Sequence, residues 1–93
     1  MALRTFDGVH YLQAAGGGGS TTNAFPTAVG AWETFTILKQ NGGSRIIFEG
    51  DEIALRASTG HFVVAENGGG PGSVVNANRV AVGAWETFVV HYP

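Results

Sequence analysis

The stretch AVGAWETF, residues 28–35, occurs a second time, letter for letter, as residues 81–88. The match extends toward the N-terminus of each stretch, where NAFPT precedes the first copy and NANRV the second. Two more pairs align in the same order, HYLQA at 10–14 with HFVVA at 61–65, and ALR at 2–4 with ALR at 54–56. Because the gaps between aligned segments fall in loops, we interpret the chain as two copies of one structural unit.

Each copy is predicted to form four short strands. The first, MALRTF or EIALRAS, is followed by a turn signal, Asp7-Gly8 or Thr59-Gly60. The second, HYLQA or HFVVA, is rich in aromatic and branched residues that suit a pleated surface. The third lies near STTNA or SVVNA, and the fourth is WETFTILK or WETFVVHY. With 15 glycines and no helical apolar period, the chain is predicted to be all-β, a barrel or a sandwich.

The predicted core comes from the alternation of apolar side chains along these strands. Residues on one phase of a strand point to the same face of the sheet, so the apolar phase should line the interior. The residues on that phase are Leu3, Leu12, Ala14, Phe35, Ile37, Leu55, Val63, Ala65, Phe88 and Val90.

Composition excludes several functional classes. The chain has 93 residues, enough for one domain, of which 44% are apolar and 13% charged. A formal net charge of −2 provides no basic field for nucleic acid or anionic lipid, and no apolar run is long enough to span a membrane. Without cysteine, neither a disulfide nor a thiolate metal site can form. MALRTFDG has no apolar signal region, so we expect a cytoplasmic protein, although a secreted mature form with an added Met would look the same.

The segment GDEIALRASTGHFVVAENGGGPGSVVNANRVAVGAWETFVV, residues 50–90, resembles the fascin-like β-trefoil repeat through ALR, G-H-F-x-x-A-E, the glycine loop, NANR and WETF. That family includes actin-crosslinking fascins, hisactophilins and bacterial modules attached to glycoside hydrolases. The first copy departs from the pattern at Ala15, which replaces Glu66, and at Phe25-Pro26, which replaces Asn78-Arg79. The resemblance implies β-trefoil units of four strands each, over residues 1–38 and 54–93, joined by a connecting segment over residues 39–53.

A β-trefoil has three such units, and this chain supplies two. Open strand edges and a divided apolar core would remain, so we expect the barrel to be completed by a homo-oligomer. A trimer is the first expectation, because three chains supply six units, enough for two trefoils, with residues 39–53 crossing between the barrels. A dimer is the next expectation, and a partner protein that supplies the third unit is another.

The resemblance also implies a non-catalytic, lectin-like module that binds carbohydrate. Sugar sites combine an exposed aromatic face with fixed amide and carboxylate groups. The candidate binding residues are Tyr11, Gln13 and Asn23 in the first copy, and Phe62, Glu66, Asn76, Asn78 and Arg79 in the second. The alternative for the asparagines is turn formation. Trp32 and Trp85 could also form sugar platforms, but their identical contexts favour packing beneath the barrel.

No enzyme is expected. Glu33 and Glu86 occupy equivalent positions, so nothing would separate their pKa values as glycoside hydrolysis requires, and we expect them to pair with Arg4 and Arg56. GGGGS is followed by no Gly-Lys-Ser/Thr, so it is not a phosphate loop, and no cofactor is expected. The alternative function is a protein-interaction or structural module of fascin type, which crosslinks actin or assembles with itself.

The three histidines are not predicted to bind a metal. His10 and His61 occupy equivalent positions after the first turn of each copy, and His91 stands alone near the end of the chain. They lack the close spacing of a zinc site. We therefore interpret them as polar residues that flank turns.

Overall fold

The structure, a computed structural model, describes residues 1–42 and 46–91. Residues 43–45 of the predicted connecting segment and residues 92–93 of the predicted second unit lie outside the described residues. Seven short strands form: β1 (Gln13–Ala14), β2 (Ser20–Asn23), β3 (Thr36–Lys39), β4 (Glu52–Arg56), β5 (Phe62–Ala65), β6 (Val75–Arg79) and β7 (Phe88–Val89). Four one-turn 3₁₀ segments lie between them: η1 (Ala15–Gly17), η2 (Ala31–Glu33), η3 (Glu66–Gly68) and η4 (Ala84–Glu86).

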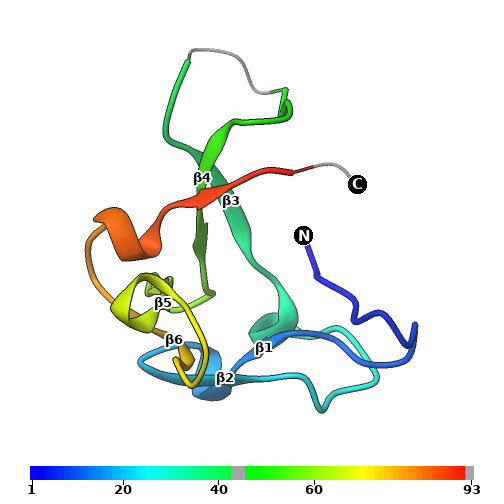
Figure 1. The fold of residues 1–93 in the computed structure, drawn as a ribbon. Coiled ribbons are helices and arrows are strands. Elements are labelled where there is room, and N and C mark those ends of the chain that lie inside the picture. The colour runs from blue at the N-terminus through cyan, green and yellow to red at the C-terminus, as the bar shows by residue number, and fades with distance from the viewer. Residues whose placement is uncertain (43–45, 92–93) are drawn as a thin grey trace.

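All strand pairs are antiparallel, which confirms the prediction of an all-β chain. The sheet runs in the order β1-β2-β6-β5-β4-β3, and β7 also pairs with β4. Figure 1 shows β3 and β4 as neighbouring strands, with the β1, β2, β5 and β6 group at one end of them. The two copies are joined at two places in this sheet, by β3 with β4 and by β2 with β6.

The segment between the copies turns back on itself. The strands before and after it, β3 and β4, pair from Thr36 opposite Arg56 to Lys39 opposite Ile53. The expectation that this segment crosses from one barrel to another is therefore wrong, because it joins two strands that lie side by side in one sheet.

A buried ion pair fixes the base of this turn. Lys39 Nζ lies 3.1 Å from Asp51 Oδ2, and both side chains are only 12% exposed. The same carboxylate accepts hydrogen bonds from the Phe48 amide at 2.7 Å and from Asn41 Nδ2 at 3.2 Å. These bonds, the Phe48 amide first, lower the pKa of Asp51 below its ordinary value.

The repeated sequence has a repeated backbone. In η2 the carboxylate of Glu33 accepts the Gly30 amide at 2.8 Å, and in η4 the carboxylate of Glu86 accepts the Gly83 amide at 2.7 Å. The turns η1 and η3 also correspond, because each has a residue with positive φ at its centre, 70° at Gly16 and 58° at Asn67. Equivalent residues can therefore be compared between the copies.

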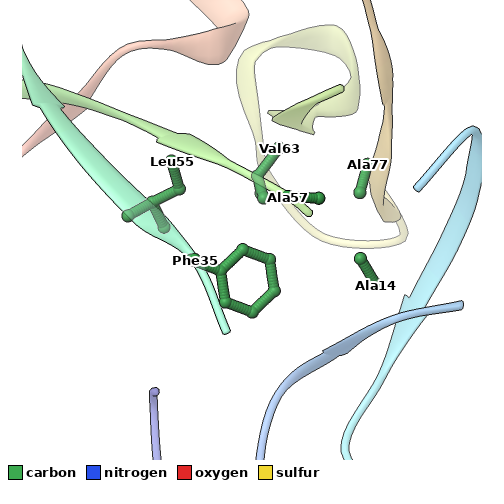
Figure 2. Close-up of a cluster of buried hydrophobic side chains, with 6 residues drawn as sticks. All are labelled: Ala14, Phe35, Leu55, Ala57, Val63 and Ala77. Carbon is green, nitrogen blue, oxygen red and sulfur yellow. The ribbon is translucent and has the colours of Figure 1, made fainter. Parts of the chain in front are cut away.

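The core lies where the two copies meet, and Figure 2 shows its six buried side chains: Ala14, Phe35, Leu55, Ala57, Val63 and Ala77. Four of these were predicted from the strand alternation, all but Ala57 and Ala77. Four more predicted residues are partly buried against the cluster: Leu3, Leu12, Ile37 and Phe88. The prediction is wrong for Ala65 and Val90, which are half-buried outside it. Val64 and Ala54 are fully buried although they lie on the opposite phase, since both faces of their strands are covered.

Burial differs between equivalent residues in a consistent way. Leu55 and Val63 of the second copy are buried, whereas their counterparts in the first copy, Leu3 and Leu12, are only half-buried. The difference reverses in the last strand, where Phe35 is 1% exposed and its counterpart Phe88 is half-buried. Leu3, Leu12 and Phe88 therefore bound a less covered part of the core, which we call the open side.

Candidate functional site

The second copy gathers four predicted binding residues into one polar network. Glu66 is its centre, at the start of η3, directly after β5. Its Oε1 accepts a hydrogen bond from Arg79 Nη2 at 2.6 Å, and its Oε2 accepts one from Asn76 Nδ2 at 2.8 Å. Arg79 Nη1 donates to Asn78 Oδ1 at 3.2 Å. The β5–β6 hairpin brings these groups together because Asn76, Asn78 and Arg79 all lie on β6.

Glu86 adds a second carboxylate to the network. Its Oε2 lies 3.8 Å from Arg79 Nε, and its side chain is buried. We had expected Glu86 to pair with Arg56 and Glu33 to pair with Arg4, and both expectations are wrong. Arg4 and Arg56 are exposed, and neither forms an ion pair within the described residues.

The first copy builds a version of the same network with one carboxylate and no arginine. Asn23 Nδ2 donates to Gln13 Oε1 at 2.8 Å, and Gln13 Nε2 donates to Glu33 Oε2 at 2.7 Å. In the first copy, Gln13 both accepts the hydrogen bond of the asparagine and donates one to the carboxylate of Glu33. In the second copy these roles are divided, because Glu66 accepts from the asparagine and Arg79 faces Glu86. This explains how the first copy accommodates Ala15 in place of the equivalent glutamate.

Both tryptophans lie at the surface, next to these networks. Trp85 directly precedes Glu86, and a Cβ placed on Gly68 would lie 3.5 Å from its indole. Trp32 lies in the same way against Gly17, at 3.2 Å. The two tryptophans are 44% and 48% exposed, respectively, so the expectation that they pack beneath the barrel is wrong. Each indole rests on a glycine backbone and leaves nearly half of its surface to solvent.

The two remaining predicted residues border the networks. Phe62 lies opposite Arg79 in the register of β5 and β6, so both project from the same face of the sheet. Tyr11 donates its amide to the Pro26 carbonyl at 2.8 Å and is half-buried. Pro26 replaces the arginine, and the residue opposite Tyr11 in the first copy is Arg4, through an isolated antiparallel bridge.

The histidines lie apart from the networks, beside turns. His10 Nδ1 is 2.6 Å from Asp7 Oδ2, and His61 Nδ1 is 2.8 Å from Thr59 Oγ1. Within residues 1–42 and 46–91, no group of three histidine or acidic residues could hold a metal ion. In the same part of the chain, no helix has the length and apolar character needed to cross a membrane.

Comparison with known proteins finds no match. No family model fits this chain, and neither a curated protein nor a solved structure resembles it. The fascin-like resemblance of the motifs therefore stays a prediction from the sequence, and the site must be judged on its geometry.

Sequence reasoning found the members of the networks more accurately than it found their surroundings. Gln13 with Asn23, and Glu66 with Asn76, Asn78 and Arg79, were all predicted and are brought together. It assigned Glu33 and Glu86 to the wrong partners and placed the tryptophans inside the fold. The sequence carried no signal for the first error, because the β5–β6 register places Arg79 opposite Phe62, and its contacts with Glu66 and Glu86 depend on the direction of its long side chain.

Proposed function

We propose that this chain is a non-catalytic, lectin-like module that binds carbohydrate, built from β-trefoil-type units. The observation that carries the proposal is the half-exposed Trp85 next to the network of Glu66, Arg79 and Glu86. A sugar ring has an apolar face of C–H groups that packs on an indole, and a rim of hydroxyls that bind charged and amide groups. This combination occurs here between η3, η4 and β6.

The network supports ligand binding through its unused hydrogen-bonding capacity. A guanidinium has five N–H donors in a fixed fork, and the hydrogen bonds of Arg79 to Glu66 and Asn78 use two of them. The Arg79 side chain is more than one-third exposed, so solvent-facing donors are available to hydroxyls. Because Glu66 already holds the guanidinium in place, little side-chain entropy would be lost on binding.

The first copy offers a weaker site of the same type. Trp32 directly precedes Glu33, which is linked by hydrogen bonds to Gln13 and through it to Asn23, and this network contains no arginine. Hydrogen bonds to charged groups are stronger than neutral ones, at about 1.5–3 kcal/mol against about 1. The proposal therefore expects the Trp85 site to be the tighter of the two.

The proposal is tested by calorimetry with plant and bacterial polysaccharides selected from a glycan array. Trp85→Ala should weaken binding at least tenfold, which corresponds to about 1.4 kcal/mol. The matched variant Trp32→Ala, which removes the same side chain from the same local sequence, should weaken binding less. An array without a hit, or equal affinity for the unaltered chain and the Trp85→Ala variant, would refute carbohydrate binding.

A protein-interaction module of fascin type is the second candidate. It is favoured by large apolar side chains that are almost fully exposed, namely Phe6, Phe25 and Val80. Such residues often mark contact surfaces when they are clustered. Co-sedimentation with actin filaments tests this candidate, and no sedimentation at either low or moderate salt would exclude actin as the partner.

A further inference from the structure

Within the chain, a turn of the second copy docks on the glycine loop of the first. The Gly17 carbonyl accepts hydrogen bonds from the Thr59 amide at 3.1 Å and from Thr59 Oγ1 at 2.7 Å. Ser58 Oγ donates to the same carbonyl at 3.3 Å. A Cβ placed on Gly18 would overlap Thr59 Oγ1, so only glycine admits the turn at this distance.

The equivalent loop of the second copy has no turn docked on it. Gly68 corresponds to Gly17, because each ends its 3₁₀ turn, and Gly69 corresponds to Gly18. A Cβ placed on Gly68 would meet only the Trp85 indole, and one placed on Gly69 or Gly70 would meet nothing within 4 Å. The glycine loop of residues 68–70 therefore has the backbone of a docking site and lacks the occupant.

The first copy has a turn of matching shape. The Thr5 amide donates to the His10 carbonyl at 2.9 Å, as Ala57 does to His61 at 2.8 Å. The next bond matches too, since the Gly8 amide donates to the Thr5 carbonyl at 2.9 Å, as the Gly60 amide does to Ala57. In this turn, Phe6 occupies the place of Ser58, and its side chain is fully exposed.

We propose that the turn of residues 5–10 of one copy of this chain docks on the glycine loop of residues 68–70 of a second copy, with Phe6 against the Trp85 indole. A second copy is the occupant because the chain carries both the turn and the loop, and shows in its own interior how they fit. Each chain of a pair offers one free turn and one free loop. Two chains can satisfy both contacts reciprocally when they keep the local fit of turn on loop but close as a pair, because a second chain placed at the three-fold angle of a β-trefoil would overlap the first. The open side is close in sequence to both parts of the contact. Leu3, which bounds the open side, shortly precedes the turn, and Phe88, which also bounds it, follows Trp85 by three residues.

The chemistry of the proposed contact differs in one respect from that of the Thr59 turn docked on the Gly17 loop within the chain. Asp7 occupies the place of Thr59, but its carboxylate accepts hydrogen bonds from Thr5 Oγ1 at 2.6 Å and from the Val9 amide at 2.9 Å. It cannot replace the donation by Thr59 Oγ1. The Phe6–Trp85 contact replaces that bond, and aromatic pairs contribute beyond their buried area.

Intact chains are favoured over chains that exchange their copies. In an exchanged arrangement, the first copies of several chains would assemble in one barrel and the second copies in another. That would separate β3 from β4, which pair over Thr36–Lys39, and would break the buried ion pair of Lys39 and Asp51. Docking of intact chains costs neither. The contact does not rest on the proposed carbohydrate binding. Phe6 and a sugar ring would compete for the Trp85 indole, whereas Trp32, 48% exposed with a turn already docked beside it, stays open in the pair.

Light scattering at micromolar concentration tests the pair. The unaltered chain should have the mass of two chains, and Phe6→Ser, which introduces the residue of the second copy, should have the mass of one. Val80→Thr is the control, because it also removes an exposed apolar residue in favour of its counterpart, Thr27. A single-chain mass for the unaltered protein overturns the proposal, as does an equal loss of mass in both variants. Circular dichroism should show that the Phe6→Ser variant is folded.

Cross-linking distinguishes docking from exchange. The chain has no cysteine, so single cysteines can be placed at will. Val9→Cys chains mixed with Ala84→Cys chains should be joined by a short bis-maleimide, because Ala84 is next to Trp85. Val9→Cys mixed with Ala31→Cys, the equivalent residue beside Trp32, should give far less product. A mass of three chains with cross-links to position 31 would show exchanged copies and overturn the reciprocal pair.

Discussion

Phe35 and Phe88 are the same residue of the same repeated octapeptide, and they differ in burial. Phe35 is 1% exposed in the core, whereas Phe88 is half-buried at the open side. Phe35→Ala should therefore lower the free energy of unfolding by about 3–5 kcal/mol, as is usual for a buried phenylalanine. Phe88→Ala should cost clearly less in a chain kept monomeric by Phe6→Ser. Urea denaturation measures both, and equal losses would contradict the difference in burial.

Asp51 makes the stability of the turn between the copies depend on pH. The Phe48 amide, Lys39 and Asn41 all favour its ionised form, so its pKa lies below the ordinary value of about 4. A carboxylate with a lowered pKa contributes stability above its unfolded-state pKa and loses that contribution as pH falls toward its folded-state pKa. Asp51→Asn should therefore melt at a lower temperature than the unaltered chain at pH 7.

The melting temperatures of the two proteins should approach each other as pH falls below about 4. Glu52→Gln is the control, because Glu52 is the neighbouring exposed carboxylate on β4. Its melting temperature should follow that of the unaltered chain at both pH values. A difference for Asp51→Asn that stayed constant from pH 7 to pH 3 would show that ionisation of Asp51 is not the cause.

At the scale of elements, the two glycine loops provide a matched comparison. Gly18 and Gly69 both have positive φ, 132° and 100°, so alanine is strained at either position. Only at Gly18 would the added Cβ also overlap Thr59. Gly18→Ala should therefore destabilise the chain more than Gly69→Ala, measured by urea denaturation in the Phe6→Ser background. The reverse order would mean that the Thr59 turn does not dock on the first glycine loop.

The elements could be predicted where the information is local or repeated. Turn signals and alternation predicted four strand regions in each copy, and all strands but β6 lie within them, while β6 begins inside its region and extends two residues past it. The prediction is wrong for MALRTF, residues 1–6, which forms no strand and contributes only the bridge of Arg4 with Tyr11. The direction taken by residues 39–53 could not be predicted, because it depends on the Lys39–Asp51 pair across the turn. Nor could the exposure of Trp32 and Trp85, since a repeated sequence does not reveal which face of a glycine loop an indole covers.

The members of the second network could be selected by residue type, and Asn76 lies near Glu66 because the β5–β6 register pairs it with Val64. The contact of Glu66 with Arg79 could not be predicted from the hairpin, because the same register places Arg79 opposite Phe62. The partner of Glu86 was not predictable, because pairing with Arg79 or with Arg56 depends on which strand passes beside η4. The sequence repeat suggested Arg56 as the partner of Glu86, because each copy contains both an equivalent arginine and an equivalent glutamate. In the structure, the partner of Glu86 is Arg79, which lies on β6.

For the whole molecule, the proposed pair makes stability depend on concentration. If two folded chains unfold to two separate chains, raising the concentration tenfold stabilises the pair by about 1.4 kcal/mol, or about 0.7 kcal/mol for each chain. In a domain of 60–100 residues, a change of 1 kcal/mol shifts the melting temperature by about 4–8 °C. The unaltered chain should therefore melt about 3–6 °C higher for each tenfold rise in concentration. Phe6→Ser should melt at one temperature throughout, because it lacks the side chain that holds the Trp85 loop of its partner. A concentration-independent melt of the unaltered chain would contradict the pair, and a dependence retained in Phe6→Ser would place the contact elsewhere on the surface.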